Sequence, residues 1–330
     1  MTSLARLADT LDRLVDDGAL EGWAAGVRAD DTTRLAAGGC RSAEEPAPIA
    51  SCTKPMAGAL TLRLVELGVV ALDDPVGRWL PELAAPRVLA RPGARLDDTV
   101  AAERPITLRH LLTMTPGFGW VGEGGPLAEA MAEQQVAPSP HAPPMTPDEL
   151  MRRLGRLPLA DQPGRTWRYH TSSDVLGVLL ERATGHSPRD LLRRHVTGPL
   201  GMAETDFAAG VELQSLATGL WSTVADQLLF LAALADAGGP VLEAGSVRAM
   251  CTDQLTPSQR TGTTDFLGDG SGWGHHVEVR PDGLVGWAGG LGTIGYAAPG
   301  RRRAAALFTW QGMDTAGTLD AFGAFWDLLG

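Results

Sequence analysis

This 330-residue chain almost lacks lysine: 27 of its 28 basic residues are arginine, and Lys54 is the only lysine. An arginine guanidinium stays protonated in proteins and cannot accept a proton. A lysine amine can act as a base once burial or a nearby positive charge lowers its pKa. Lys54 is therefore the only long basic side chain here that can work in its neutral form.

Cysteine, positive charge and long apolar runs are also in short supply. Cys40, Cys52 and Cys251 lie far apart with no Cys-x-x-Cys spacing, so the sequence predicts neither a disulfide framework nor a zinc site. A net charge of −11 disfavours nucleic acid and anionic membranes as partners. No apolar run approaches the ~20 residues of a membrane span, and residues 1–20 have the pattern of an amphipathic helix rather than a signal peptide. We expect a cytoplasmic protein, and the sequence does not indicate its oligomeric state.

Motifs of several enzyme classes are missing. The two G-x-G-x-x-G matches, at residues 117–122 and 290–295, lack the strand-turn-helix context of a dinucleotide site. Neither G-x-S-x-G nor H-E-x-x-H occurs. A metal hydrolase and an ordinary Ser-His-Asp triad are therefore both unsupported, although the triad stays open, and we expect neither a metal nor an organic cofactor.

The hydrophobic pattern places strands at both ends of the chain and helices in the middle. Strands are expected within residues 22–39, 272–290 and 293–310, and Asp30-Asp31 suggests a hairpin turn. Helices are expected at residues 52–68, 106–117, 126–134, 146–157, 173–185, 187–201, 223–239 and 317–329. These elements predict an α/β plus all-α fold, in which an antiparallel sheet from both termini is flanked by helices and carries an inserted helical domain.

The corresponding domain boundaries are residues 1–60 with 265–330 for the α/β domain and 61–264 for the mainly helical domain. We expect the active site at the interface between these two parts.

A serine stands three residues before the lone lysine, in Ser51-Cys52-Thr53-Lys54. Positions i and i+3 of a helix are neighbours, so Ser51 and Lys54 would share one face, with Cys52 turned about 100° away. At a helix start, the N–H of Ser51 would lack a partner and the helix dipole would favour a developing anion. An N-cap serine followed by an exposed lysine explains the same four residues equally well.

Longer stretches decide between these two interpretations. Residues 49–83 resemble the class C β-lactamase and D-alanyl-D-alanine carboxypeptidase superfamily, most of all its carboxylesterase branch. The likeness continues through residues 106–118, 162–207 and 286–300 and covers roughly residues 10–315. This resemblance implies a β-lactamase/penicillin-binding-protein-like fold and Ser51 as the nucleophile of an acyl-enzyme.

The resemblance also assigns further site residues. The tyrosine of the family's Y-x-N element matches Tyr169, and the W-x-G of many esterase relatives matches Trp287, Ala288 and Gly289. The N–H of Gly290 would form the oxyanion hole with that of Ser51. Tyr169 coupled to Lys54 would take the Ser51 proton, and which of the two is the formal base stays open because the pair titrates as a unit.

Two departures from the family pattern affect substrate choice. Thr171 stands where asparagine is expected and has no amide group, so it cannot donate to a substrate and accept from Lys54 as easily. Trp287 replaces the lysine of K-T-G, which would help to bind a substrate carboxylate. Both changes weaken recognition of β-lactams and D-Ala-D-Ala and favour an apolar ester site.

Two further side chains are candidates for substrate contact. Trp120, in the predicted loop 117–145, is either a pocket wall or a packing tryptophan. A two-residue turn at Pro281-Asp282 would place His276 opposite Trp287 on the paired strand, although a bulge would shift that register.

The sequence therefore predicts a serine hydrolase for short- to medium-chain carboxylic esters, with acyl transfer as a variant and a small-molecule ester or amide as its partner. A β-lactamase or D-Ala-D-Ala peptidase is the alternative within enzymes. A non-catalytic ligand-binding homologue is the third possibility; the joint presence of Ser51, Lys54 and Tyr169 disfavours it, and Thr171 leaves it open.

Overall fold

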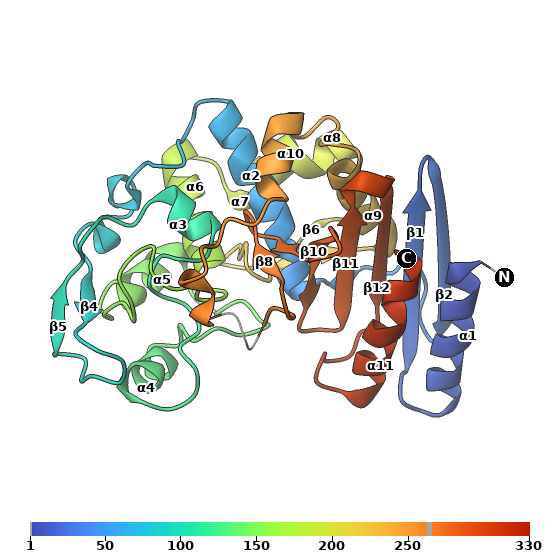
Figure 1. The fold of residues 1–330 in the computed structure, drawn as a ribbon, viewed down its shortest axis with the longest axis horizontal. Coiled ribbons are helices and arrows are strands. Elements are labelled where there is room, and N and C mark those ends of the chain that lie inside the picture. The colour runs from blue at the N-terminus through green and yellow to red at the C-terminus, as the bar shows by residue number, and fades with distance from the viewer. Residues whose placement is uncertain (1, 263–265) are drawn as a thin grey trace.

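The structure is a computed structural model that describes residues 2–262 and 266–330. Its sheet lies beside a helical region, and both chain ends lie on the sheet side (Figure 1). The seven strands run in the order β2-β1-β12-β11-β10-β9-β8, and every neighbouring pair is antiparallel. Their bounds are β1 Gly22–Ala29, β2 Thr32–Gly39, β8 Gly272–Trp273, β9 Glu278–Val279, β10 Val285–Gly289, β11 Thr293–Ala298 and β12 Arg303–Phe308. The predicted sheet from both termini is confirmed.

Helices cover both faces of this sheet. Helices α1 (Ser3–Asp16) and α11 (Ala316–Phe325) pack on one face, where Leu4, Leu7 and Leu11 are buried. Helix α9 (Val224–Ala235) covers the other face, and an added Cβ at Gly26 would lie 2.6 Å from the Leu228 side chain. Helix α9 falls inside the range that the sequence assigned to the helical domain, yet it packs on the sheet.

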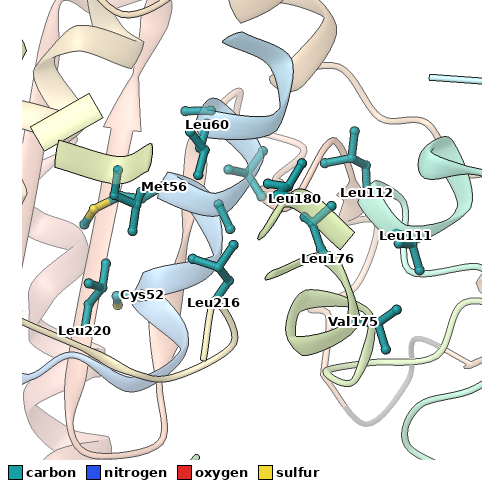
Figure 2. Packing of buried hydrophobic residues seen from close by; sticks show 14 of the residues in the cluster. Cys52, Met56, Leu60, Leu111, Leu112, Val175, Leu176, Leu180, Leu216 and Leu220 are labelled. Atoms are coloured by element: carbon teal, nitrogen blue, oxygen red, sulfur yellow. The ribbon is translucent and has the colours of Figure 1, made fainter. Parts of the chain in front are cut away.

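Helix α2 (Thr53–Glu66) runs through the centre of the molecule and connects the two regions. It lies between the strands on one side and α6 (Ser172–Thr184) with α3 (Leu108–Leu112) on the other (Figure 2). Its residues from Thr53 to Leu62 are all buried, as expected for a helix that is enclosed on every side. Gly58 lets the helix approach the segment before β9, because an added Cβ would lie 2.4 Å from the carbonyl oxygen of His275.

The helical region contains short elements around this core. The helices are α4 Pro126–Glu133, α5 Pro147–Leu154, α7 Pro188–Leu192, α8 Gly198–Leu200 and α10 Ala244–Met250; the strands are β3 Ala47–Pro48, β4 Arg87–Leu89, β5 Thr99–Ala101, β6 Asp206–Phe207 and β7 Leu220–Ser222. Thr107 and Thr146 cap α3 and α5 through their side chains. Strands β4 and β5 and helix α10 were not expected. In the part of the chain described, no helix has the length and hydrophobicity needed to cross a membrane.

Two mid-helix glycines provide a matched test of the packing around α2. We expect Gly58→Ala to lower the melting temperature, because the new Cβ would clash with the backbone carbonyl of His275. Gly323→Ala in α11 should raise it, by up to about 1 kcal/mol of stability, because its Cβ meets nothing within 4 Å and alanine has the higher helix propensity. Thermal unfolding followed by circular dichroism measures both, and a stabilised Gly58→Ala variant would contradict the close contact.

Candidate active site

Ser51 lies in a 3₁₀ turn, Ala50–Cys52, that leads directly into α2. Its neighbour Ala50 has a φ of +44°, a conformation that costs a non-glycine residue about 1–3 kcal/mol. Two strand residues hold the turn: the Thr293 hydroxyl donates to Ile49 O at 2.8 Å, and the Cys52 thiol donates to Trp287 O at 3.4 Å. Strands β10 and β11 therefore fix the position of Ser51.

Lys54 lies in the first turn of α2 and is fully buried. Its Nζ is 2.8 Å from Ser51 Oγ and 2.8 Å from the carbonyl oxygen of Ala217. Burial lowers the pKa of the Lys54 amine to about 7, although the charge of Asp174 acts in the opposite direction. The amine is thus close to the serine hydroxyl and can be neutral near pH 7.

Tyr169 stands just before α6, with its phenol directed at the same point. Trp287 Nε1–H donates to the phenol oxygen at 2.5 Å, and Lys54 Nζ lies 4.8 Å from the centre of the phenol ring. Burial raises the pKa of Tyr169, and the hydrogen bonds with Ser51 and Trp287 offset this only in part. Near pH 7 the phenol is therefore protonated and can donate a proton.

These groups open onto a cleft of about 560 Å³. Its walls include Ser51, Trp120, Tyr169, His170, Phe266, Trp287, Ala288 and Gly290. The aromatic rings contact one another: Phe266 lies 4.5 Å from the Tyr169 ring and 5.5 Å from the Trp120 ring, measured between ring centres. Aromatic rings therefore form much of the cleft wall, which also carries the charged residues Glu278, Arg280 and Asp314.

Gly289 and Thr171 lie behind this cleft wall rather than in it. An added Cβ at Gly289 would lie 2.4 Å from Ile49 O, so this glycine lets β10 approach the turn that carries Ser51. Thr171 is buried, and its hydroxyl has no hydrogen-bond partner among the described residues. Gly289 thus acts through packing, and the Thr171 hydroxyl is not presented to the cleft.

His276 is also directed away from the cleft, and the register predicted for it is wrong. Glu278 pairs with Gly286 and Val279 with Val285, because the connection spans residues 281–283 instead of two residues. The buried imidazole bonds to Leu112 O at 2.9 Å and to Ser173 Oγ at 3.0 Å. Burial lowers its pKa to about 3, so His276 joins neighbouring elements as a neutral ring.

Two groups that act on Lys54 were missed, the Asp174 carboxylate and the Ala217 carbonyl. Asp174, in the first turn of α6, is buried and accepts a hydrogen bond from Ser215 at 2.5 Å. A carboxylate at the start of the apolar run "DVLGVLL" was a usable signal, because buried carboxylates are rare unless they are paired. Ala217 contributes only its backbone carbonyl, for which no sequence signal exists.

Comparison with known proteins gives the family. The family model described as Beta-lactamase matches residues 7–320, so the chain belongs to this family. Protein Rv1367c of Mycobacterium tuberculosis is 33% identical over 304 residues, which cover 76% of this chain and 74% of that protein. Esterase EstB of Burkholderia gladioli is 39% identical over 163 residues, which cover 49% of this chain and 38% of EstB.

Solved structures agree on the fold. EstCE1, described as a hydrolase with promiscuous acyltransferase activity, superposes with a TM-score of 0.82 over 99% of both chains at 20% identity. Unliganded simvastatin synthase (LovD) from Aspergillus terreus superposes with a TM-score of 0.80 over 100% of this chain and 98% of LovD, also at 20% identity. The predicted β-lactamase-like fold is confirmed.

Labelling with a fluorophosphonate tests the nucleophile. We expect Ser51→Ala to abolish labelling with little change in melting temperature, because the reactive oxygen is removed from an otherwise intact turn. Ser139→Ala is the matched control, since Ser139 also lines the cleft, and it should label like the wild type. Intact-mass spectrometry measures the adduct, and labelling that persists in Ser51→Ala would refute the assignment.

Proposed function

We propose that the chain is a serine hydrolase that cleaves carboxylic esters through an acyl-enzyme on Ser51, with acyl transfer to another acceptor as a variant. The observation that carries this proposal is the 2.8 Å contact between the buried Lys54 amine and Ser51 Oγ at the wall of an aromatic cleft. Membership of the β-lactamase family and the likeness to the esterase EstB support the same activity.

The first half-reaction begins with proton transfer from Ser51 to the neutral Lys54 amine. Ser51 Oγ then attacks the ester carbonyl, and the N–H groups of Ser51 and Gly290 stabilise the oxyanion. As the ester C–O bond breaks, Tyr169 gives its proton to the departing alcohol and recovers one from the Lys54 ammonium. Gly290 follows β10 directly and lines the cleft, which supports its role in the oxyanion hole.

The second half-reaction removes the acyl group from Ser51. A water molecule or an acceptor alcohol gives its proton to the same Lys54–Tyr169 pair and attacks the acyl carbonyl, and the Ser51 oxygen leaves with a proton. The partition between the two acceptors depends on which one the cleft holds against the acyl-enzyme. Aromatic walls at Trp120 and Phe266 would favour an apolar acceptor.

The choice of esters over β-lactams rests on two residues. Trp287 matches the lysine of K-T-G in the sequence and its indole donates to the Tyr169 phenol, so this position offers no cation for a substrate carboxylate. Thr171 does not present its hydroxyl to the cleft. A non-catalytic homologue is disfavoured because the Lys54 amine contacts Ser51 directly and carries a lowered pKa.

The cytoplasmic location also remains a proposal. It is supported by the three cysteines, which are all free thiols, as is usual in a reducing compartment: Cys40, Cys52 and Cys251. The net charge of −11 supports the expectation that nucleic acid is not a partner.

Paired substrates test this function. We expect kcat/KM for p-nitrophenyl acetate or butyrate to exceed that for nitrocefin by at least about a hundredfold, or about 2.7 kcal/mol of transition-state stabilisation. Ser51→Ala supplies the background rate for each substrate. Comparable values for nitrocefin would overturn the preference, and no turnover of any ester above this background would overturn the function.

A further inference from the structure

A buried carboxylate stands behind the catalytic lysine and does not itself line the cleft. Asp174 belongs to the first turn of α6, five residues after Tyr169, and is 4% exposed. Its Oδ1 accepts a hydrogen bond from the Ser215 hydroxyl at 2.5 Å, and its Oδ2 lies 3.8 Å from Nε2 of His170. A buried carboxylate is costly unless it is paired, so its contacts indicate what it stabilises.

The Ser215 hydroxyl connects Asp174 to the Lys54 amine through a backbone turn. The Ser215 hydroxyl donates a hydrogen bond to Asp174. Its oxygen accepts hydrogen bonds from the N–H groups of Ala217 and Thr218, both at 3.1 Å. The carbonyl oxygen of Ala217 then accepts from Lys54 Nζ at 2.8 Å. The hydrogen bonds of Asp174 and Ser215 therefore shape the turn that presents this carbonyl to the amine.

The charge of Asp174 also acts on the amine directly. Burial lowers the pKa of Lys54, and Asp174 is the largest influence in the opposite direction. In the part of the chain that the structure describes, the other ionisable groups that face Lys54 are Cys52, Tyr169, His170 and His276. Near pH 7 all four are neutral, because burial raises the pKa of the thiol and the phenol and lowers that of both imidazoles. Burial raises the pKa of Asp174 to about 6, so its carboxylate is still largely ionised near pH 7. Within residues 2–262 and 266–330, Asp174 is thus the charged group against which the amine titrates.

We propose that Asp174 is a positioning residue for Lys54: through Ser215 it builds the turn that holds the amine, and its negative charge sets the pH at which the amine loses its proton. The inference deepens the proposed function, because that pH decides when Lys54 can accept the Ser51 proton. It assigns the carboxylate a role through Lys54 and no contact with the substrate.

The lone lysine makes this titration directly measurable. Lysine labelled with carbon-13 at its ε-methylene gives one protein resonance, that of Lys54, and its chemical shift follows protonation of the amine. We expect the wild type to titrate near pH 7. In Asp174→Asn the midpoint should fall by about 1 or more on the pH scale, because asparagine can still accept from Ser215 but removes the charge.

Two further variants separate this effect from general destabilisation. Asp226→Asn is the matched control, since Asp226 is also a buried first-turn carboxylate, in α9, bonded by Thr205 and by the N–H of Glu204, both at 2.9 Å. It should leave the midpoint unchanged. Ser215→Ala should also lower the midpoint, but by less than Asp174→Asn, because the Ser215 hydrogen bond helps to keep Asp174 ionised. Ser215→Ala carries the test if Asp174→Asn does not fold.

An unchanged or raised midpoint in Asp174→Asn would overturn the inference, and so would an equal fall in Asp226→Asn. If Asp174→Asn does not fold, an unchanged or raised midpoint in Ser215→Ala has the same meaning. The titration needs no substrate, so its outcome does not depend on whether the protein hydrolyses esters. A wild type that titrates as expected and hydrolyses no ester would refute the function alone.

Discussion

The chemistry proposed for the site depends on the burial of one amine, that of Lys54, away from water. Removing a lysine from water disfavours its charged form, so the enclosure of Lys54 is what makes a base of a group that is normally protonated at pH 7. The structure achieves this by placing Lys54 on α2, the helix that is packed between the sheet and α6. The central position of α2 is therefore as much a requirement of the chemistry as a property of the core.

The two ionisable groups beside Ser51 are driven in opposite directions by the same burial. The pKa of Lys54 falls and that of Tyr169 rises, so the amine is the better acceptor and the phenol the better donor. From sequence, the choice of base stayed open. In the proposed mechanism Lys54 is therefore the base and Tyr169 the proton donor. The Trp287 indole, which offers no charge to a substrate, holds the Tyr169 phenol in place through its hydrogen bond.

Local patterns in the sequence predicted much of this arrangement, because they rest on short-range geometry. Helical spacing brought Ser51 and Lys54 together, and turn residues placed the hairpin at Asp30. The resemblance to a known family supplied Tyr169 and Trp287, which no local pattern would have joined.

The failures came where distant segments meet. The contact of the Ala217 carbonyl with Lys54 spans 163 residues of chain, and a backbone group carries no sequence signature. His276 was misplaced because one more residue in the turn 281–283 shifts every cross-strand pair. Helix α9 lies within the range 61–264 yet packs on the sheet, because an apolar helix does not reveal in its sequence which surface it will cover.

Replacing Lys54 by arginine tests the central claim most directly. Arginine keeps the positive charge and cannot accept a proton, so kcat for p-nitrophenyl butyrate should fall by about 10²–10⁴ if Lys54 is the base. Arg63→Lys, the reverse exchange on the same helix, should retain nearly wild-type kcat, because Arg63 lies away from the cleft and pairs with Glu66. With folding of both variants checked by thermal melts, a Lys54→Arg enzyme with near wild-type turnover would contradict the account.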